Sequence, residues 1–279
     1  MPFVTAFYRA LGTGMVISVD SPIDDKVRSA MESLIEDYEH VLSRFRNDSL
    51  IAAIGKAEHG GSFDFPDWCA PLFDLYDALF SATSGAIDPC VGEDLIRLGY
   101  DASLSFTVTQ DAPEHLGALR GRAVWGRDVT RHGTTLVTHE PVQLDFGACG
   151  KGYLVDLLGR MLQSSQFVID AGGDLLIHAE QPISVALEDP EDQSHAIGIA
   201  HIANGALCAS APSRRHWNVA VNERTQIAIH HLLNAIDGLP AQQTEASWAY
   251  VPANATLNLA RDYPTAVADG LATALFVSD

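Results

Sequence analysis

The spacing of apolar residues predicts four amphipathic helices. Apolar side chains recur at three- and four-residue intervals, which is the spacing of one helical face. The first helix breaks near residues 44–49, where Asp48 or Ser49 would cap a second, shorter helix. The helix predicted over 67–83 ends at Ser84-Gly85, because glycine adopts the left-handed conformation that closes many helices. The four helical stretches are 24–54, 67–83, 150–164 and 266–276.

Short apolar or alternating runs predict strands between these helices. The strands come in runs, which favours an α+β fold with antiparallel sheet over a parallel doubly wound fold. No linker or internal repeat interrupts the 279 residues, so we expect one domain over 1–279, within which a division into two subdomains stays open. The predicted strands are 11–19, two or three within 123–144, 167–169, 175–178, 183–187, 196–202, 217–221, 227–233 and 248–251.

Composition and charge narrow the classes of partner. Hydrophobic residues make up 47% of the chain, which is enough for a globular core. The 36 acidic and 17 basic side chains give a net charge of −19, which argues against nucleic acid or an anionic membrane surface as the main partner. No apolar run reaches the ~18–20 residues of a membrane span. Residues 1–20 show no signal peptide or lipid-attachment cysteine, so we expect a cytoplasmic protein.

The placement of the cysteines argues against zinc and disulfides. Structural zinc needs cysteines or histidines paired at short spacing, and no CxxC pair is present. We therefore expect isolated buried thiols. The four cysteines are Cys69, Cys90, Cys149 and Cys208.

The segment from Leu144 to Tyr153 gathers three glycines around Lys151, just before a predicted helix. Glycines let backbone groups approach a ligand closely, and a helix N-terminus favours anions. Lys151 would add a compact positive charge. The spacing differs from that of a P-loop, which needs GxxxxGK[ST]. The segment is therefore either an anion site or a tight strand-to-helix turn with a solvated lysine.

A carboxylate and a hydroxyl share one face of the last predicted helix. Asp269 and Thr273 stand four residues apart, which places both side chains on the same side of the helix. Such hard oxygen atoms suit Mg²⁺. Without further evidence, the pattern alone favours a simple solvent-facing pair.

Four weaker signals stand elsewhere in the chain. In His230-His231, at the end of a strand-like run, one imidazole would act as general base or only satisfy a hydrogen bond. Arg44, at the helix break, would bind phosphate or lie along an apolar surface. Asp88 would hold a ligand amide or its own backbone. Residues 172–174, with the sequence GGD, are of the kind that forms hairpin turns.

Separately these signals are weak, but their order along the chain resembles the ApbE family. The glycine-rich segment 144–153, together with Asp156, looks like the family's lysine–glycine signature. The match covers nearly the whole chain. The other segments that follow the family's order are 11–13, 43–45 with 48–49, 85–89, 172–174, 189–190, 230–231 and 269–273.

The resemblance implies an FAD:protein FMN transferase. Such an enzyme splits FAD at its pyrophosphate, releases AMP and attaches FMN to a Thr or Ser of a target flavoprotein. The implied fold is the family's two-part α+β arrangement, related to tunnelling folds, with FAD in a cleft. Some relatives hydrolyse FAD to FMN and AMP instead, so hydrolysis and non-catalytic FAD binding stay open as alternatives.

The resemblance also implies site residues, position by position. The Mg²⁺ ligands would be the Ala148 main-chain oxygen, Asp269 and Thr273. Lys151 would lie near the FAD phosphates. His231 would take the proton from the acceptor hydroxyl, and Asp269 is the second residue expected to be catalytic. The other implied FAD contacts are Leu11, Gly12, Thr13, Ser43, Arg44, Phe45, Asp88, His231 and Leu232.

Two stretches differ from the family's pattern. Its His-x-x-Asp-Pro is HLLNA at 231–235 in this chain, without the carboxylate and the proline. Its Thr-Ser-Gly is ASA at 209–211. These two changes are what supports the non-catalytic alternative.

Overall fold

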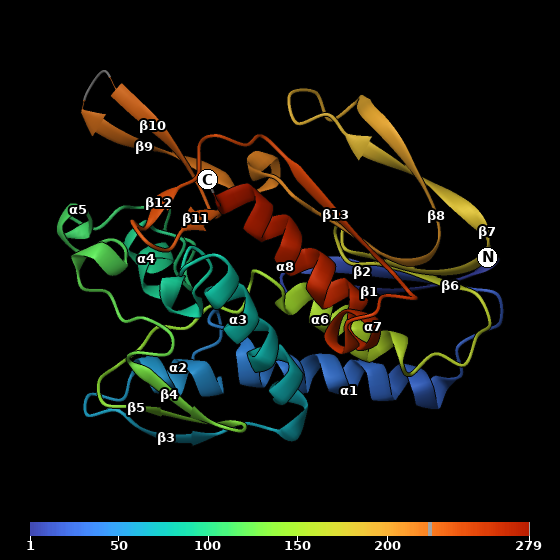
Figure 1. Cartoon of the computed structure of the whole chain (residues 1–279), viewed down its shortest axis with the longest axis horizontal. Coiled ribbons are helices and arrows are strands. Elements are labelled where there is room, and N and C mark those ends of the chain that lie inside the picture. The colour runs from blue at the N-terminus through green and yellow to red at the C-terminus, as the bar shows by residue number, and fades with distance from the viewer. Residues whose placement is uncertain (223–224, 279) are drawn as a thin grey trace. The chain divides into compact units, whose positions relative to one another are not determined.

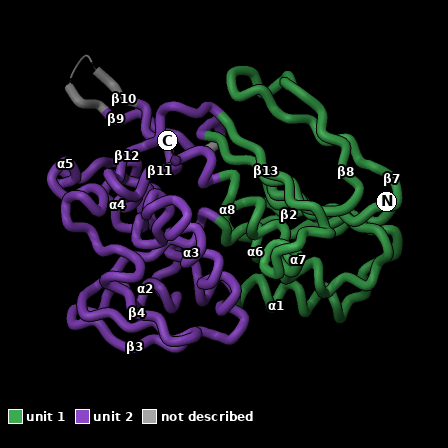
Figure 2. Tube along the Cα trace, in the orientation of Figure 1, with its two compact units in different colours: residues 1–37, 149–211, 246–272 green, residues 38–148, 212–245, 273–279 purple. Residues whose placement is uncertain are grey.

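The computed structural model describes residues 1–222 and 225–278. It contains two compact units, each built from three separate stretches of the chain (Figure 2). Helices and antiparallel sheets together confirm the expected α+β class. Unit 1 contains residues 1–37, 149–211 and 246–272, and unit 2 contains residues 38–148, 212–245 and 273–279.

Unit 1 is organised around a six-stranded antiparallel sheet with the order β1-β2-β6-β7-β8-β13 (Figure 1). Alternate side chains of β2 turn inward, so Met15, Ile17 and Val19 are each at most 1% exposed. The turn between β1 and β2 joins Ala10 to its partner Thr13. The strands are β1 (Phe3–Ala10), β2 (Thr13–Val19), β6 (Phe167–Asp170), β7 (Leu175–Glu188), β8 (Ala196–Ser210) and β13 (Ser247–Pro252).

Small residues let the helices of unit 1 pack closely on this sheet and on one another. Ala260 of α7 and Ala268 of α8 form a buried cluster with Cys208 of β8. A Cβ on Gly152 of α6 would stand 2.4 Å from the carbonyl oxygen of Thr265 in α8, so α6 and α8 are in close contact. These helices are α6 (Gly150–Gly159), α7 (Asn258–Asp262) and α8 (Pro264–Val277), and α1 (Asp25–Leu42) also begins in unit 1.

Unit 2 combines short helices with small antiparallel sheets. Its three-stranded sheet has the order β3-β5-β4, while β9 pairs with β10 and β11 with β12. The strands are β3 (Gly61–Asp64), β4 (Val129–His132), β5 (Thr135–Thr138), β9 (His216–Asn222), β10 (Thr225–His230), β11 (Leu233–Asn234) and β12 (Leu239–Pro240). The α-helices are α2 (Leu50–Gly55), α3 (Ala70–Ala82), α4 (Gly92–Arg97) and α5 (Ala112–His115), with single 3₁₀ turns at 67–69, 89–91, 118–120 and 212–214.

An aromatic cluster anchors the chain just before the glycine-rich turn. The Phe146 ring meets Phe73 at 5.5 Å, Tyr76 at 5.1 Å and Trp125 at 6.4 Å between ring centroids. All four side chains are buried, none being more than 4% exposed. Packed aromatic rings bury large apolar areas, so they fix the backbone from which the turn at residues 147–149 departs.

The helix break is confirmed, and several element boundaries differ from those predicted. Helix α1 ends at Leu42, and Ser49, rather than Asp48, caps α2 by accepting a hydrogen bond from Ala52 N at 3.1 Å. The helix expected over 150–164 ends at Gly159. The two strands expected at 175–178 and 183–187 form one strand, β7, with a register shift between them.

The cysteine expectation is confirmed, because all four cysteines are buried thiols. Burial raises the pKa of Cys69, Cys90 and Cys208 above the ordinary value, so these thiols stay protonated near neutral pH. Within residues 1–222 and 225–278, no helix is both long enough and apolar enough to cross a membrane.

Candidate active site

The glycine-rich turn before α6 orients the Ala148 carbonyl in unit 2. Asp145 Oδ1 accepts a hydrogen bond from Gly147 N at 2.6 Å, which closes the turn locally. Ala148 N donates to Tyr76 Oη at 3.2 Å, and Ala148 O accepts from Thr273 Oγ1 at 3.1 Å. Two of the three predicted metal-binding oxygen atoms are therefore direct neighbours.

A lysine lies between two buried carboxylates in unit 1; Lys151, Asp174 and Asp269 form what we call the lysine cluster. Lys151 Nζ donates to Asp174 Oδ2 at 2.7 Å and to Asp269 Oδ1 at 3.1 Å. Asp269 Oδ2 also accepts from Gly152 N at 3.0 Å. The side chains of both aspartates are 2% exposed, against 32% for Lys151. With all three groups ionised, the lysine cluster carries one excess negative charge.

Burial and the neighbouring charges shift the pKa values in the lysine cluster. Burial raises the pKa of Asp269 above its ordinary value, Asp174 adds to the rise, and Lys151 opposes it. Burial lowers the pKa of Lys151, but the attraction of the two carboxylates outweighs burial, so the net shift is upward. Lys151 is therefore protonated near neutral pH. A second cation beside Asp269 would relieve the repulsion between the carboxylates.

Helix α8 carries Asp269 and Thr273 one turn apart, as their spacing predicted. Asp156 of α6 holds the first turn of this helix, since its carboxylate accepts from Thr265 N at 3.0 Å and from Ala266 N at 2.8 Å. These N–H groups have no partner within the helix itself. Asp156 and Asp269 thus connect α6 and α8 at two places, each accepting backbone N–H groups of the other helix.

The predicted FAD contacts Leu11, Gly12 and Thr13 lie at the β1–β2 turn of unit 1. Leu11 has φ of 54° and Gly12 has φ of 69°. The left-handed conformation costs a residue with a Cβ about 1 kcal/mol, so the turn holds Leu11 in a strained conformation. A Cβ on Gly172 would stand 2.8 Å from Thr13 Oγ1, so this turn packs against the 172–174 turn that carries Asp174.

Arg44 of unit 2 is held by protein partners. It forms an ion pair with Asp145, donates to the Tyr100 carbonyl, and its side chain is 6% exposed. Its guanidinium carbon lies 4.2 Å from the Phe45 ring centroid and 4.7 Å from that of Tyr100, within cation–π range. Ser43 follows the end of α1 directly. Phe45 is the exposed member of this predicted group.

His231 lies one residue beyond the end of β10. The rule that side chains alternate between the two faces of a strand therefore does not fix the direction of its imidazole. Its Nδ1 is 3.2 Å from the carbonyl oxygen of Arg215, and its ring meets Tyr100 edge-on at 6.4 Å. A carbonyl can only accept, so Nδ1 carries the proton in this contact and Nε2 is the acceptor nitrogen of the neutral ring. His230 lies within β10, with its Nε2 beside a backbone carbonyl, and Leu232 is buried.

The Asp88 carboxylate accepts hydrogen bonds from backbone N–H groups, which is one of the two alternatives that the sequence left open. Its Oδ1 accepts from Cys90 N at 2.8 Å, and Trp125 N lies at 3.3 Å. Burial raises the pKa of Asp88, and the charge of Arg122 opposes the rise. A contact between Asp88 and FAD stays a prediction.

Sequence reasoning missed three residues that organise the site. Asp174 was visible only as part of a turn, and its partner Lys151 is 23 positions away, so no local pattern indicated the pair. Tyr100 and Arg122 stand in stretches without a recognisable periodicity. The signal for Arg122 was that an arginine next to the apolar run 123–125 needs an acidic partner when buried.

These features define an α+β protein with the lysine cluster at the junction of α6 and α8. The chain belongs to the ApbE family, whose family model matches residues 11–279. The FAD:protein FMN transferase of Klebsiella pneumoniae is 23% identical over 236 residues, which is 81% of this chain and 66% of that protein. The FAD:protein FMN transferase of Treponema pallidum is 27% identical over 286 residues, or 90% of this chain and 72% of that protein.

Solved structures share the fold. The ApbE protein of Thermotoga maritima matches with a TM-score of 0.77 and 20% identity, over 99% of this chain and 86% of that chain. The flavin transferase ApbE of Vibrio cholerae matches with a TM-score of 0.76 and 19% identity over the same shares, 99% and 86%. The expected family and fold are confirmed, and the roles of single residues stay predictions.

Proposed function

We propose that this chain is a Mg²⁺-dependent FAD:protein FMN transferase, which moves FMN from FAD to a Thr or Ser of an acceptor flavoprotein and releases AMP. Membership of the ApbE family, whose matched relatives are named as FAD:protein FMN transferases, supports the activity. The observation that carries the proposal is the lysine cluster, where a cationic Lys151 is held by Asp174 and Asp269. Phosphoryl transfer depends mainly on positioning and on charge neutralisation, which Lys151 and a cation bound beside the cluster would supply together.

The proposed Mg²⁺ ligands are the Ala148 carbonyl oxygen, Thr273 Oγ1 and the Asp269 carboxylate. The donor set fits this ion, because all three are hard oxygen atoms. Thr273 Oγ1 already contacts Ala148 O at 3.1 Å, and Asp269 precedes Thr273 by one helical turn. The excess negative charge of the lysine cluster also favours a bound cation. When bound, Mg²⁺ would neutralise charge that develops on the AMP leaving group.

The proposed FAD contacts are those that the family resemblance implies. Lys151 would face the pyrophosphate, and the strained turn of Leu11, Gly12 and Thr13 would contact the flavin end of FAD. In unit 2 the proposed contacts are Ser43, Arg44, Phe45, Asp88 and Leu232. Arg44 Nε and Nη1 and the Asp88 carboxylate are bonded to protein groups, so these two residues would act mainly by holding their segments in shape.

His231 is the proposed general base. Its Nδ1 proton points to the Arg215 carbonyl, which leaves Nε2 as the basic nitrogen. In the proposed step the acceptor hydroxyl loses its proton to His231 while its oxygen bonds to the FMN phosphorus. The bond between that phosphorus and the AMP oxygen breaks at the same time, and AMP leaves with the electron pair.

The experiment that tests this function combines the purified chain with FAD, Mg²⁺ and a flavoprotein acceptor. We expect AMP in solution and a mass increase of the acceptor that corresponds to FMN. Asp269→Ala should lower both rates at least ~100-fold, because it removes a metal ligand and a partner of Lys151. Asp262→Ala, which removes an exposed carboxylate near the end of α7, should leave both unchanged.

Each other outcome replaces the proposal with a definite alternative. AMP with free FMN, whether or not acceptor is present, would indicate an FAD pyrophosphatase. FAD that stays intact through prolonged incubation with Mg²⁺ would indicate a non-catalytic FAD-binding protein. Full activity in Asp269→Ala would remove Asp269 from the metal site.

A further inference from the structure

The strand that follows His231 is tied to the end of α8 by one side-chain amide. Asn234 Nδ2 donates to the carbonyl oxygen of Val277 at 3.1 Å, and Asn234 Oδ1 accepts from Ile236 N at 2.9 Å. Val277 is the last residue of α8, so its carbonyl has no partner within the helix. An amide carries both a donor and an acceptor, whereas a carboxylate at this position would offer acceptors only.

The next residue is held through its backbone on both sides. Ala235 N donates to Ala86 O at 3.0 Å, which is a bond that proline cannot make. Ala235 O accepts from Arg122 Nη2 at 2.7 Å and from Ala118 N at 3.2 Å. Each backbone group of Ala235 is therefore paired with a different segment of unit 2.

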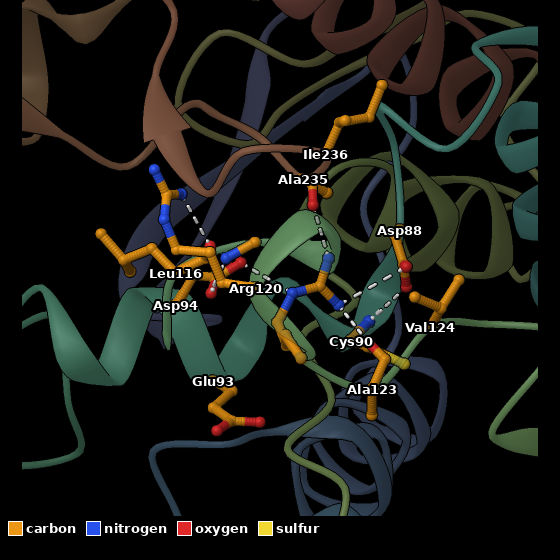
Figure 3. Close-up of polar contacts among 12 residues, drawn as sticks. Asp88, Cys90, Glu93, Asp94, Leu116, Arg120, Ala123, Val124, Ala235 and Ile236 are labelled. Carbon is orange, nitrogen blue, oxygen red and sulfur yellow. Dashed lines mark hydrogen bonds and ion pairs between the residues drawn. The ribbon is translucent and has the colours of Figure 1, made fainter. Parts of the chain in front are cut away.

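Arg122, which holds Ala235, also forms ion pairs with Asp88 and Asp94, both of which are labelled in Figure 3. Arg122 Nε lies 2.7 Å from Asp94 Oδ2, and Arg122 Nη1 lies 3.5 Å from Asp88 Oδ2. All three side chains are at most 1% exposed. Asp94 Oδ1 also accepts from Gly117 N at 2.8 Å. Removing Arg122 would leave two buried carboxylates without their cation, so the network depends on this arginine.

These contacts join the part of unit 2 that carries His231, the proposed general base, to the part that carries Thr273, a proposed Mg²⁺ ligand. Asn234 and Ala235 follow His231 by three and four residues, and Val277 follows Thr273 by one helical turn. We infer that Asn234 and Ala235 are positioning residues, which set the place of His231 relative to the Thr273 end of α8. This inference rests on the proposed catalytic role of His231.

The test is Asn234→Asp in the full chain. The aspartate keeps the acceptor for Ile236 N but loses the donor to Val277 O, and it places a negative charge at the C-terminal end of α8. We expect the kcat for AMP release from FAD with Mg²⁺ and acceptor to fall ~10- to 100-fold, because small misplacements of a catalytic group are that costly. The KM for FAD should stay within about threefold, since Asn234 lies outside the proposed FAD contacts.

Three further variants sharpen the result. Asn204→Asp is the matched control, because Asn204 Nδ2 likewise donates to a backbone carbonyl, that of Ala179 in unit 1, at 3.3 Å. Its kcat should equal that of the unchanged protein. Asn234→Ser has a side chain too short to bond to Val277 O, and it adds no charge. It replaces Asn234→Asp in the test if the aspartate variant does not fold. Ala235→Pro removes the bond to Ala86 O and should lower kcat in the same way.

A second readout does not depend on activity. Hydrogen exchange of peptides covering 270–278 should become faster in Asn234→Asp and stay unchanged in Asn204→Asp. If the unchanged protein proves inactive, the proposed function fails while this exchange result still tests the Asn234 link. The inference is overturned if Asn234→Asp and Asn234→Ser keep kcat within twofold, if the Asn204 control loses as much, or if exchange at 270–278 does not change.

Discussion

Asp156 is a buried carboxylate that holds the first turn of α8 in unit 1. It is 3% exposed, and both of its oxygens accept backbone N–H groups of that turn. Burial raises its pKa from 3.8 to about 7, against the lowering effect of the N–H donors. The folded protein therefore binds the Asp156 proton more tightly than the unfolded chain does.

This shift makes stability depend on pH in a definite direction. Between about pH 4 and 7 the folded state keeps a proton that the unfolded state has lost, so the unfolding free energy falls as pH rises. The contribution of Asp156 is on the order of 4 kcal/mol across that window. In urea titrations at several pH values, Asp156→Asn should flatten the fall, while Asp262→Asn should keep it. An unchanged slope in Asp156→Asn would rule out this origin.

Single residues also show what sequence could and could not predict about the site. The i, i+4 spacing of Asp269 and Thr273 was enough to predict that their side chains lie on one face of the helix, because the period of a helix is fixed. The partners of Lys151 were out of reach, since Asp269 lies 118 positions away and only tertiary packing brings it close. For Arg44 the sequence left two alternatives open, binding phosphate or lying along an apolar surface. Its partner in the structure, Asp145, lies 101 positions away, so no local pattern could indicate it.

At the scale of elements, length decided which predictions succeeded. Long amphipathic helices such as α1 and α3 contain several turns, so their apolar spacing stands out from chance. Helices α4, α5 and α7 have six residues or fewer and give no measurable period. Strand β1 was missed although it has eight residues, because apolar Phe3, Val4 and Tyr8 are all exposed and break the inward–outward alternation.

The contact between α6 and α8 depends on the absence of a side chain at Gly152. A Cβ there would stand 2.4 Å from the Thr265 carbonyl oxygen, which is backbone and cannot turn aside. Gly152→Ala should therefore lower the unfolding free energy by about 1–3 kcal/mol. Gly14→Ala in β2 is the control: a Cβ there meets nothing within 4 Å, so the change should be neutral or stabilise by up to ~1 kcal/mol. Equal urea midpoints for the two variants would contradict this account of the packing.

At the scale of the whole molecule, the net charge of −19 is not balanced by the buried clusters. The lysine cluster and the Arg122 network each contain one cation and two carboxylates, so neither offsets the acidic surface. Self-repulsion should therefore weaken the compact state at low ionic strength. A phosphate ligand would need the local cations proposed above rather than a basic surface.

The repulsion leads to a prediction about salt. At pH 7, raising KCl from ~0.05 to ~0.5 M should increase the urea midpoint, because added ions screen charges over less than ~10 Å. Near pH 4.7, the isoelectric point of the sequence, the same addition should have little effect. A midpoint at pH 7 that is insensitive to KCl would show that surface repulsion does not limit stability.

The two units alternate along the chain, with changes after residues 37, 148, 211, 245 and 272. Translation at roughly 5–20 residues per second needs about 10–40 s to pass from residue 38 to residue 246, where the last stretch of unit 1 begins. Neither unit can finish assembling until the ribosome has nearly completed α8, which contributes residues to both. A cut between any two of these stretches consequently leaves at least one unit divided between the products, so a split version must supply both products together.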